Sequence, residues 1–110
     1  MQAAQRLDEL RRRWAPELYS ELDSALLYNR KLWTIFAAEM GNDASELPLQ
    51  LRNNIASIAV FVFKRSLELL AKPAAEPIAA LVDINRNIAA GLLAAPSAAA
   101  APPATAAEIA

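Results

Sequence analysis

The sequence predicts an all-α protein: a small bundle of three to four helices with a disordered, alanine- and proline-rich C-terminal tail. Three observations favour this class. Hydrophobic residues make up 55% of the sequence but aromatic residues only 6%, so alanine and leucine, both strong helix formers, dominate. Only two glycines are present, which leaves little scope for hairpin turns. Apolar residues recur three and four positions apart along most of the chain.

Composition divides the chain into a helical domain over residues 1–93 and a tail over residues 94–110. A length of 110 residues suits one domain, near the lower end of what a hydrophobic core stabilises unaided. The tail consists mainly of alanine and proline and has no large side chain until Ile109. Because it has little to bury against the entropy of ordering, we expect it to be disordered.

The first two helices are separated by Pro16. A helix over Ala3 to Trp14 places Leu7, Leu10 and Trp14 on one side. Proline suits the first turn of a helix, where its missing N–H would have no partner, so a longer helix is predicted from Pro16 to Met40. Gly41 is expected to close it in a left-handed conformation. The buried seam of this second helix comprises Leu22, Leu26, Asn29, Trp33, Phe36 and Met40.

The third and fourth helices are also punctuated by proline. Pro48 predicts the start of a helix that runs to about Ala71, and Pro73 disfavours helical geometry at the residue before it. A last helix is predicted from about Pro77 to Leu93. The third helix contains the stretch "IASIAVFVF", which leaves no polar face. Either the first helix covers its outer side, or part of this surface meets a partner or a second copy, so a homodimer stays open.

Each of the three long helices carries an amide within its apolar stripe: Asn29, Asn54 and Asn85. In the structural interpretation, these side chains are buried and hydrogen-bond one another or the backbone, which specifies which helices meet. In the functional interpretation, they line a groove and bond a guest helix. The structural interpretation is favoured.

Composition argues against several functional classes. The chain has no cysteine and no histidine, and it lacks a glycine-rich phosphate loop and a nucleophile elbow. We therefore expect no enzyme, no catalytic residues, no cofactor and no metal site. A net charge of −1 and basic clusters interspersed with acids argue against direct nucleic-acid binding. No apolar run approaches the roughly 20 residues of a membrane span, so we expect a soluble cytoplasmic protein.

Candidate partner-binding residues are the large side chains on or near the apolar stripes. Tyr28 and Ile35 lie together beside the main stripe of the second helix, next to glutamates. Phe61 and Phe63 point about 160° apart on their helix, so one core can hardly bury both. Trp33 is also a candidate partner-binding residue, although its position at the centre of the stripe favours a role in the core. We expect one of the two phenylalanines to join Tyr28 and Ile35 in a partner surface.

Three separated segments resemble the FlaF family of flagellar biosynthesis regulators of alphaproteobacteria. They are "LLYNRKLWTIFAAEM", "LPLQLRNNIASIAVFVFKRSLELL" and "PIAALVDINRNIAAGL". The resemblance extends from about Glu21 to Leu93, with "NRKLWT", the start of the third helix and "DINRNI" as its most specific parts. The stretch "RLDELRRRWAPEL" matches weakly, and the tail is outside the pattern.

The resemblance implies a small cytoplasmic helical protein that is needed for flagellin production and export. Family members are thought to bind flagellin, in this case by its helical terminal regions, before secretion. They also act with FlbT, a second regulator that restrains flagellin synthesis. The expected function is therefore a flagellin-binding secretion chaperone. The alternative is a post-transcriptional regulator that acts through FlbT without a direct chaperone role.

Overall fold

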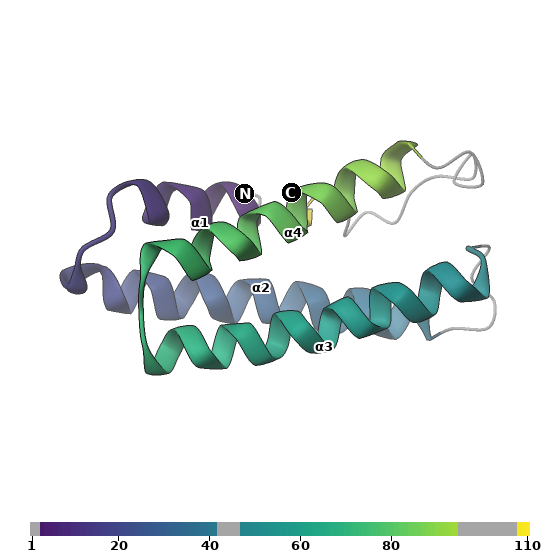
Figure 1. Cartoon of the computed structure of the whole chain (residues 1–110), viewed down its shortest axis with the longest axis horizontal. Coiled ribbons are helices and arrows are strands. Elements are labelled where there is room, and N and C mark those ends of the chain that lie inside the picture. The colour runs from purple at the N-terminus through teal and green to yellow at the C-terminus, as the bar shows by residue number, and fades with distance from the viewer. Residues whose placement is uncertain (1–2, 42–46, 95–107) are drawn as a thin grey trace.

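The computed structural model describes residues 3–41, 47–94 and 108–110, in which four α-helices form an elongated bundle (Figure 1). In chain order they are α1 (Ala3–Arg12), α2 (Tyr19–Met40), α3 (Leu49–Ala71) and α4 (Ala75–Ala94). A short 3-10 helix, η1 (Pro16–Leu18), precedes α2. The described residues contain no strand, and the all-α prediction is confirmed.

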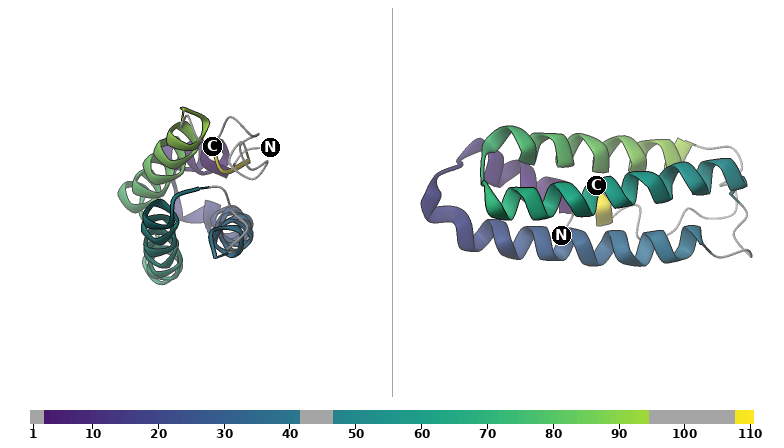
Figure 2. Two further views of the ribbon diagram at one scale, coloured as in Figure 1. Left: turned by 90° about the vertical axis from the view of Figure 1, so that its right-hand side faces the viewer. Right: turned by 60° about the horizontal axis from the view of Figure 1, so that its bottom comes forward.

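Viewed along the bundle, the four helices occupy the corners of a square (Figure 2). α1 packs against α4 and α2, and α3 packs against α2 and α4. α1 and α3 are therefore diagonal to each other, as are α2 and α4. Because α1 stands at the opposite corner, it does not cover the outer side of α3.

Proline sets the end of the first helix. Ala15, which precedes Pro16, is extended, with φ −154° and ψ 154°. This conformation is what the residue before a proline favours, and α1 accordingly ends at Arg12 rather than at the predicted Trp14. The predicted helix from Pro16 begins as η1, in which the Leu18 N–H donates to the Ala15 carbonyl oxygen at 2.9 Å, and continues as α2.

The end of α2 differs from the prediction in one respect. Gly41 has φ −81° and ψ −6°, which is right-handed, so the expectation of a left-handed glycine is wrong. Its N–H still donates to the Ala37 carbonyl oxygen at 3.1 Å, as in the helix. Because this bond continues the hydrogen-bond pattern of α2, Gly41 keeps helical geometry and needs no left-handed conformation.

The remaining boundaries follow the prolines closely. Pro48 directly precedes α3, and Lys72, before Pro73, leaves the helical region with φ −137° and ψ 82°. α4 begins at Ala75, two residues before the predicted Pro77. This is compatible with proline because the first four N–H groups of a helix have no intrahelical acceptor.

The core runs through the centre of the bundle and draws on all four helices. α2 contributes more of the core than any other helix, with Trp33 and Phe36 fully buried and in edge-to-face contact at 5.5 Å between ring centroids. The other large side chains with almost no exposure are Leu7, Leu22, Leu26, Ile55, Val62, Leu69, Ile78, Leu81 and Ile109. The seam predicted for α2 is buried throughout.

Asn54, one of the three amides predicted to be buried, lies outside this core. Asn54 is exposed, which corrects the expectation that it belongs to a buried polar set. The buried face of α3 consists of Ile55, Ala59, Val62, Ser66 and Leu69. Asn54 is one residue, or 100° of rotation, away from Ile55, and it therefore points to solvent.

Residues 95–107, over which a disordered tail is expected, lie outside the described residues. Ile109, however, is fully buried and belongs to the hydrophobic core. The expectation that the tail buries almost nothing is therefore wrong for this residue. Within the described ranges, none of the helices combines the length and apolar character needed to cross a membrane.

Candidate functional site: an apolar groove between α2 and α3

The exposed large apolar side chains of the described residues gather on two helices. The seven described by their exposure all belong to α2 or α3: Tyr19, Leu27, Ile35, Leu49, Val60, Phe61 and Leu67. Val60 and Leu67 are 66% and 59% exposed, although water-facing positions of a helix are usually polar. The surplus apolar surface predicted for the third helix is thus present, because α3 packs only against α2 and α4.

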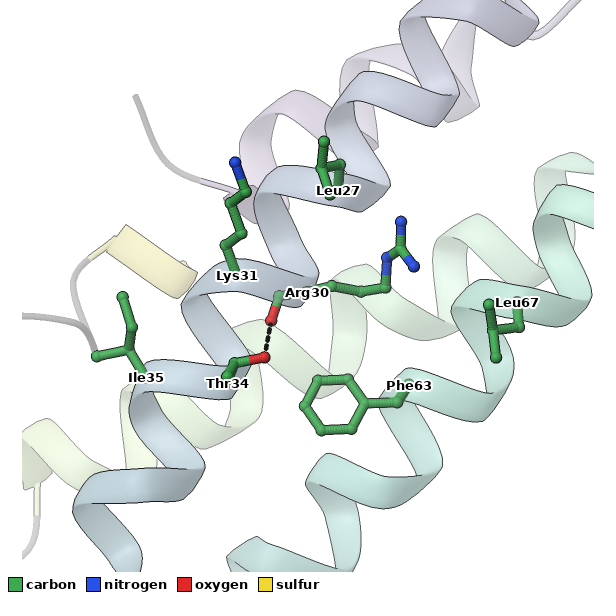
Figure 3. A pocket seen from close by; sticks show the side chains of 7 residues that line it. All are labelled: Leu27, Arg30, Lys31, Thr34, Ile35, Phe63 and Leu67. Atoms are coloured by element: carbon green, nitrogen blue, oxygen red, sulfur yellow. Dashed lines mark hydrogen bonds between the residues drawn. The ribbon is translucent and has the colours of Figure 1, made fainter.

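Part of this surface forms a groove of about 610 Å³ between α2 and α3 (Figure 3). From α2, Arg30 and Thr34 project toward α3, and Leu27, Lys31 and Ile35 form the outer edge. From α3, Phe63 and Leu67 line the opposite side. We call these seven residues the α2–α3 groove.

Helical periodicity positions both walls of the α2–α3 groove. Leu27, Lys31 and Ile35 are four residues apart and therefore occupy successive turns of one face of α2. Phe63 and Leu67 have the same spacing on α3. Leu27 and Ile35 are 45% and 53% exposed, so each wall presents apolar groups to solvent along two or more turns.

The α2–α3 groove is positively charged at its α2 side. No carboxylate of the described residues forms an ion pair with Arg30 or Lys31. The Nε of Arg30 is buried and donates no hydrogen bond. The Thr34 hydroxyl donates to the Arg30 carbonyl oxygen at 2.8 Å within the helix, so the threonine is already satisfied. The arrangement therefore suits a ligand that combines apolar side chains with a carboxylate.

The structure places two of the five predicted partner-binding residues, Ile35 and Phe63, in this groove. It adds Leu27 and Leu67, which sequence analysis did not select. The signal for Leu27 was its isolation among polar residues on the outer face of its helix. Leu67 follows the stretch "IASIAVFVF", on which the prediction of a partner surface for α3 was based, and was therefore not selected.

Phe61 lies in a different place from Phe63, as their angular separation predicts. It is 42% exposed and lines a smaller groove between α3 and α4, next to Ile84 and Ile88. The Arg65 guanidinium lies 5.0 Å from the centre of its ring. The two phenylalanines therefore serve two separate surfaces.

Tyr28 and Trp33 are both directed away from the α2–α3 groove. Tyr28 is half-buried, and the guanidinium of Arg6 on α1 lies 5.9 Å from its ring centre. Trp33 is completely buried. Tyr28 thus contacts α1, and Trp33 belongs to the core.

Asn29 and Asn85 meet at the centre of the bundle, and neither is exposed. Asn85 Nδ2 donates to Asn29 Oδ1 at 2.7 Å, and Asn85 Oδ1 accepts the indole N–H of Trp33 at 2.9 Å. These bonds join α2 and α4 across the diagonal of the square. A buried amide pair of this kind specifies which helices face each other and in which register.

A charged cluster joins α1 to α4 on the other side of the molecule. Asp8 is largely buried and pairs with Arg11 at 2.7 Å, Arg12 at 3.0 Å and Arg86 at 3.6 Å. The hydrogen bond from Arg11 lowers the pKa of Asp8 below its usual 3.8, against the opposing effect of burial, and the charges of all three arginines act in the same direction. The cluster is a structural contact, because its carboxylate is fully engaged.

The groove is therefore suited to binding and carries no reactive side chain beyond a hydroxyl and two cations. Among the described residues, no group of three or more acidic side chains is placed to hold a metal ion.

No curated protein and no solved structure matched the chain. A family model, described as flagellar protein FlaF, matches residues 1–92. That match includes α1 and "RLDELRRRWAPEL", so the segment that resembled the family only weakly is part of the family pattern. Since the match covers all four helices except the end of α4, the chain belongs to the FlaF family of flagellar proteins.

Proposed function

We propose that this protein is a cytoplasmic chaperone that binds flagellin before its export. In this proposal, the α2–α3 groove receives a terminal helix of flagellin and shields its apolar face until the flagellin reaches the export apparatus. The observation that carries the proposal is a groove with apolar walls on a protein of a flagellar family. Monomeric proteins rarely leave contiguous apolar surface exposed unless it serves binding.

The shape of the groove favours a helical guest. Leu27, Lys31 and Ile35 repeat once per turn along α2, and Phe63 and Leu67 do so along α3. A guest helix lying along this direction would place side chains at positions i, i+3 or i+4 and i+7 between the two walls. An extended peptide would instead point alternate side chains into solvent.

The charge of the groove restricts the guest further. Arg30 and Lys31 have no acidic partner among the described residues, and burial of the Arg30 Nε makes an unpaired state costly. The guest helix should therefore carry an aspartate or glutamate on the edge of its apolar face. A basic or purely apolar helix would bind less well, because it would leave these cations desolvated without compensation.

A titration with purified flagellin tests the proposal. Isothermal titration calorimetry should detect binding of full-length flagellin and lose it when the terminal helical regions of flagellin are removed. FlbT should be titrated in parallel under the same conditions. Binding of FlbT with no heat from flagellin would favour the regulator alternative and overturn the chaperone proposal. Equal binding of flagellin with and without its termini would contradict the proposal that the groove binds a terminal helix of flagellin.

A further inference from the structure

The fourth corner of the bundle is only partly filled by α1. α1 has 10 residues, whereas α2, α3 and α4 have 22, 23 and 20. At about 1.5 Å per residue, α1 spans about 15 Å and the other helices about 30 to 35 Å. α1 lies between α2 and α4, and its N-terminal end stops near the middle of the bundle (Figure 1).

Residues 108–110 lie beside that end of α1 in the views of Figures 1 and 2. The side chain of Ile109 is fully buried, whereas Glu108 is exposed. The Ile109 carbonyl oxygen accepts a hydrogen bond from Asn85 Nδ2 at 3.0 Å. A single branched aliphatic side chain and one backbone carbonyl thus fix this segment in the corner that α1 leaves open.

The donor and the acceptor of each hydrogen bond at this corner are fixed by chemistry. The indole N–H of Trp33 can only donate, so it fixes Asn85 Oδ1 as its acceptor. Asn85 Nδ2 then directs its two hydrogens to Asn29 Oδ1 and to the Ile109 carbonyl oxygen. Asn29 Nδ2 remains buried without a hydrogen-bond partner. The corner consequently presents donors to any backbone that enters it, one engaged by Ile109 and one vacant.

We propose that this corner, between α2 and α4 beside the start of α1, is a peptide-binding slot. Its occupant is the segment Glu108–Ala110 of the same chain, anchored by Ile109 and held by Asn85. One anchor and one hydrogen bond make a weak ligand in free solution. Attachment to α4 through residues 95–107 raises its effective concentration to the order of millimolar, which favours docking within the chain.

The slot and the α2–α3 groove involve different sides of α2. Asn29 and Trp33 are directed into the bundle, whereas Leu27 and Ile35 are exposed. The slot therefore does not depend on the proposed function, and flagellin binding can fail without affecting it. A partner chain with the same chemistry, a branched aliphatic side chain with a free carbonyl, would compete for this slot with Glu108–Ala110.

The test uses Trp33 as a probe in a Trp14→Phe background, where it is the only remaining tryptophan. We compare the full chain with a chain that lacks Glu108–Ala110. Removing the segment should expose the corner to water, shift Trp33 emission to longer wavelength and lower the melting temperature. A synthetic peptide of residues 104–110, Ala-Thr-Ala-Ala-Glu-Ile-Ala, should reverse the shift in a saturable titration. The same peptide should leave the full chain unchanged, because its slot is occupied.

Two variants of the full chain supply controls. Ile109→Ala should reproduce the emission shift and admit the peptide, which keeps the test available if the shortened chain unfolds. Glu108→Gln should behave like the parent, because Glu108 is exposed. The proposal is overturned if the shortened chain and Ile109→Ala both match the parent in emission and melting. It is also overturned if neither responds to the peptide. Sedimentation showing that the full chain dimerises through this segment would overturn docking within one chain.

Discussion

Trp33 on α2 donates its indole N–H to Oδ1 of Asn85 on α4, across 2.9 Å and 52 positions of sequence. The two residues stand on diagonally opposite helices, so this bond crosses the centre of the bundle. Asn85 also donates to Asn29 and to the Ile109 carbonyl oxygen, which makes it the central residue of the buried polar network. An apolar core tolerates such a residue because every polar atom of Asn85 is satisfied.

This asymmetry predicts unequal effects of replacing the two amides by leucine. Asn85→Leu leaves the Trp33 N–H, Asn29 Oδ1 and the Ile109 carbonyl oxygen unpaired, each at about 1–3 kcal/mol. Asn29→Leu removes one acceptor and also removes a donor that has no partner. We expect Asn85→Leu to lower the melting temperature by about 10 °C or more and Asn29→Leu by clearly less, as measured by circular dichroism.

Asn54→Leu is the matched control for this prediction. Asn54 is exposed, so its replacement should change the free energy of unfolding by no more than about 0.5 kcal/mol and leave the melting temperature nearly unchanged. Equal losses for all three variants would show that the network at Asn85 has no special role. Flagellin affinity of the variants that remain folded should be unchanged, because none of the three residues lines the α2–α3 groove.

The aliphatic walls of the α2–α3 groove provide a second prediction. Ile35→Ala and Leu67→Ala remove exposed side chains, so stability should be nearly unchanged. Each should weaken flagellin binding at least tenfold, or about 1.4 kcal/mol, because an anchor in a binding groove is lost. Leu49→Ala removes an equally exposed leucine outside the groove and should bind like the parent. Calorimetric titration of the three variants would contradict the groove assignment if all bound alike.

Replacing each aromatic residue by alanine should affect either flagellin binding or stability, depending on the surface to which the residue belongs. Phe63→Ala should weaken flagellin binding, because Phe63 lines the α2–α3 groove. Phe61→Ala should leave binding intact, because Phe61 lines the groove between α3 and α4. Tyr28→Ala should lower the melting temperature through its contact with α1 and leave affinity unchanged. If only Phe61→Ala reduced affinity, the guest would have to be moved to the α3–α4 groove.

Charge reversal tests the expected acidic edge of the guest. Arg30→Glu should weaken flagellin binding by about tenfold or more, because it places two carboxylates together at a partly buried position. Binding of the parent should decline as salt is raised, and binding of the variant should decline less. Lys72→Glu makes the same change in net charge away from the groove and serves as the control. Equal affinity of all three proteins at low salt would exclude an acidic contact at Arg30.

The Asp8 cluster predicts a dependence of stability on pH. The pKa of Asp8 is lower in the folded protein than in the unfolded chain, chiefly through the hydrogen bond from Arg11. Its stabilisation is therefore fully present above the unfolded pKa near 3.8 and is lost as pH falls through the lower folded pKa. Asp8→Asn should reduce the melting temperature at pH 7 by about 5 °C. The difference between parent and variant should shrink below about pH 4. A difference that stays constant down to pH 2.5 would contradict this account.

The sequence by itself determined the helices and nearly all of their ends. Pro16, Pro48 and Pro73 fixed boundaries because proline restricts its own backbone and that of the residue before it, without help from the rest of the fold. The buried seam of α2 was equally predictable, because its polar and apolar faces are distinct. The end of α1 and the start of α4 differ from the prediction by two residues, at Arg12 and Ala75. At the end of α2 the boundary was predicted, but the right-handed conformation of Gly41 was not.

Only the tertiary structure decided which of several equivalent side chains are buried. The stretch "IASIAVFVF" of α3 leaves no polar face, so nothing local distinguished the side of Phe61 from that of Phe63. Asn54 fits a stripe with Leu51 and Ile58 by its spacing, but the buried stripe begins one residue later, at Ile55. The choice was made by the neighbours of α3, which are α2 and α4. Ile109 is the clearest case. In sequence it is one aliphatic residue in an alanine-rich segment, and it is buried because α1 is too short to fill its corner and Asn85 has a donor left for its carbonyl oxygen. Local propensity acts within a few residues, whereas burial depends on what the rest of the fold places opposite a side chain.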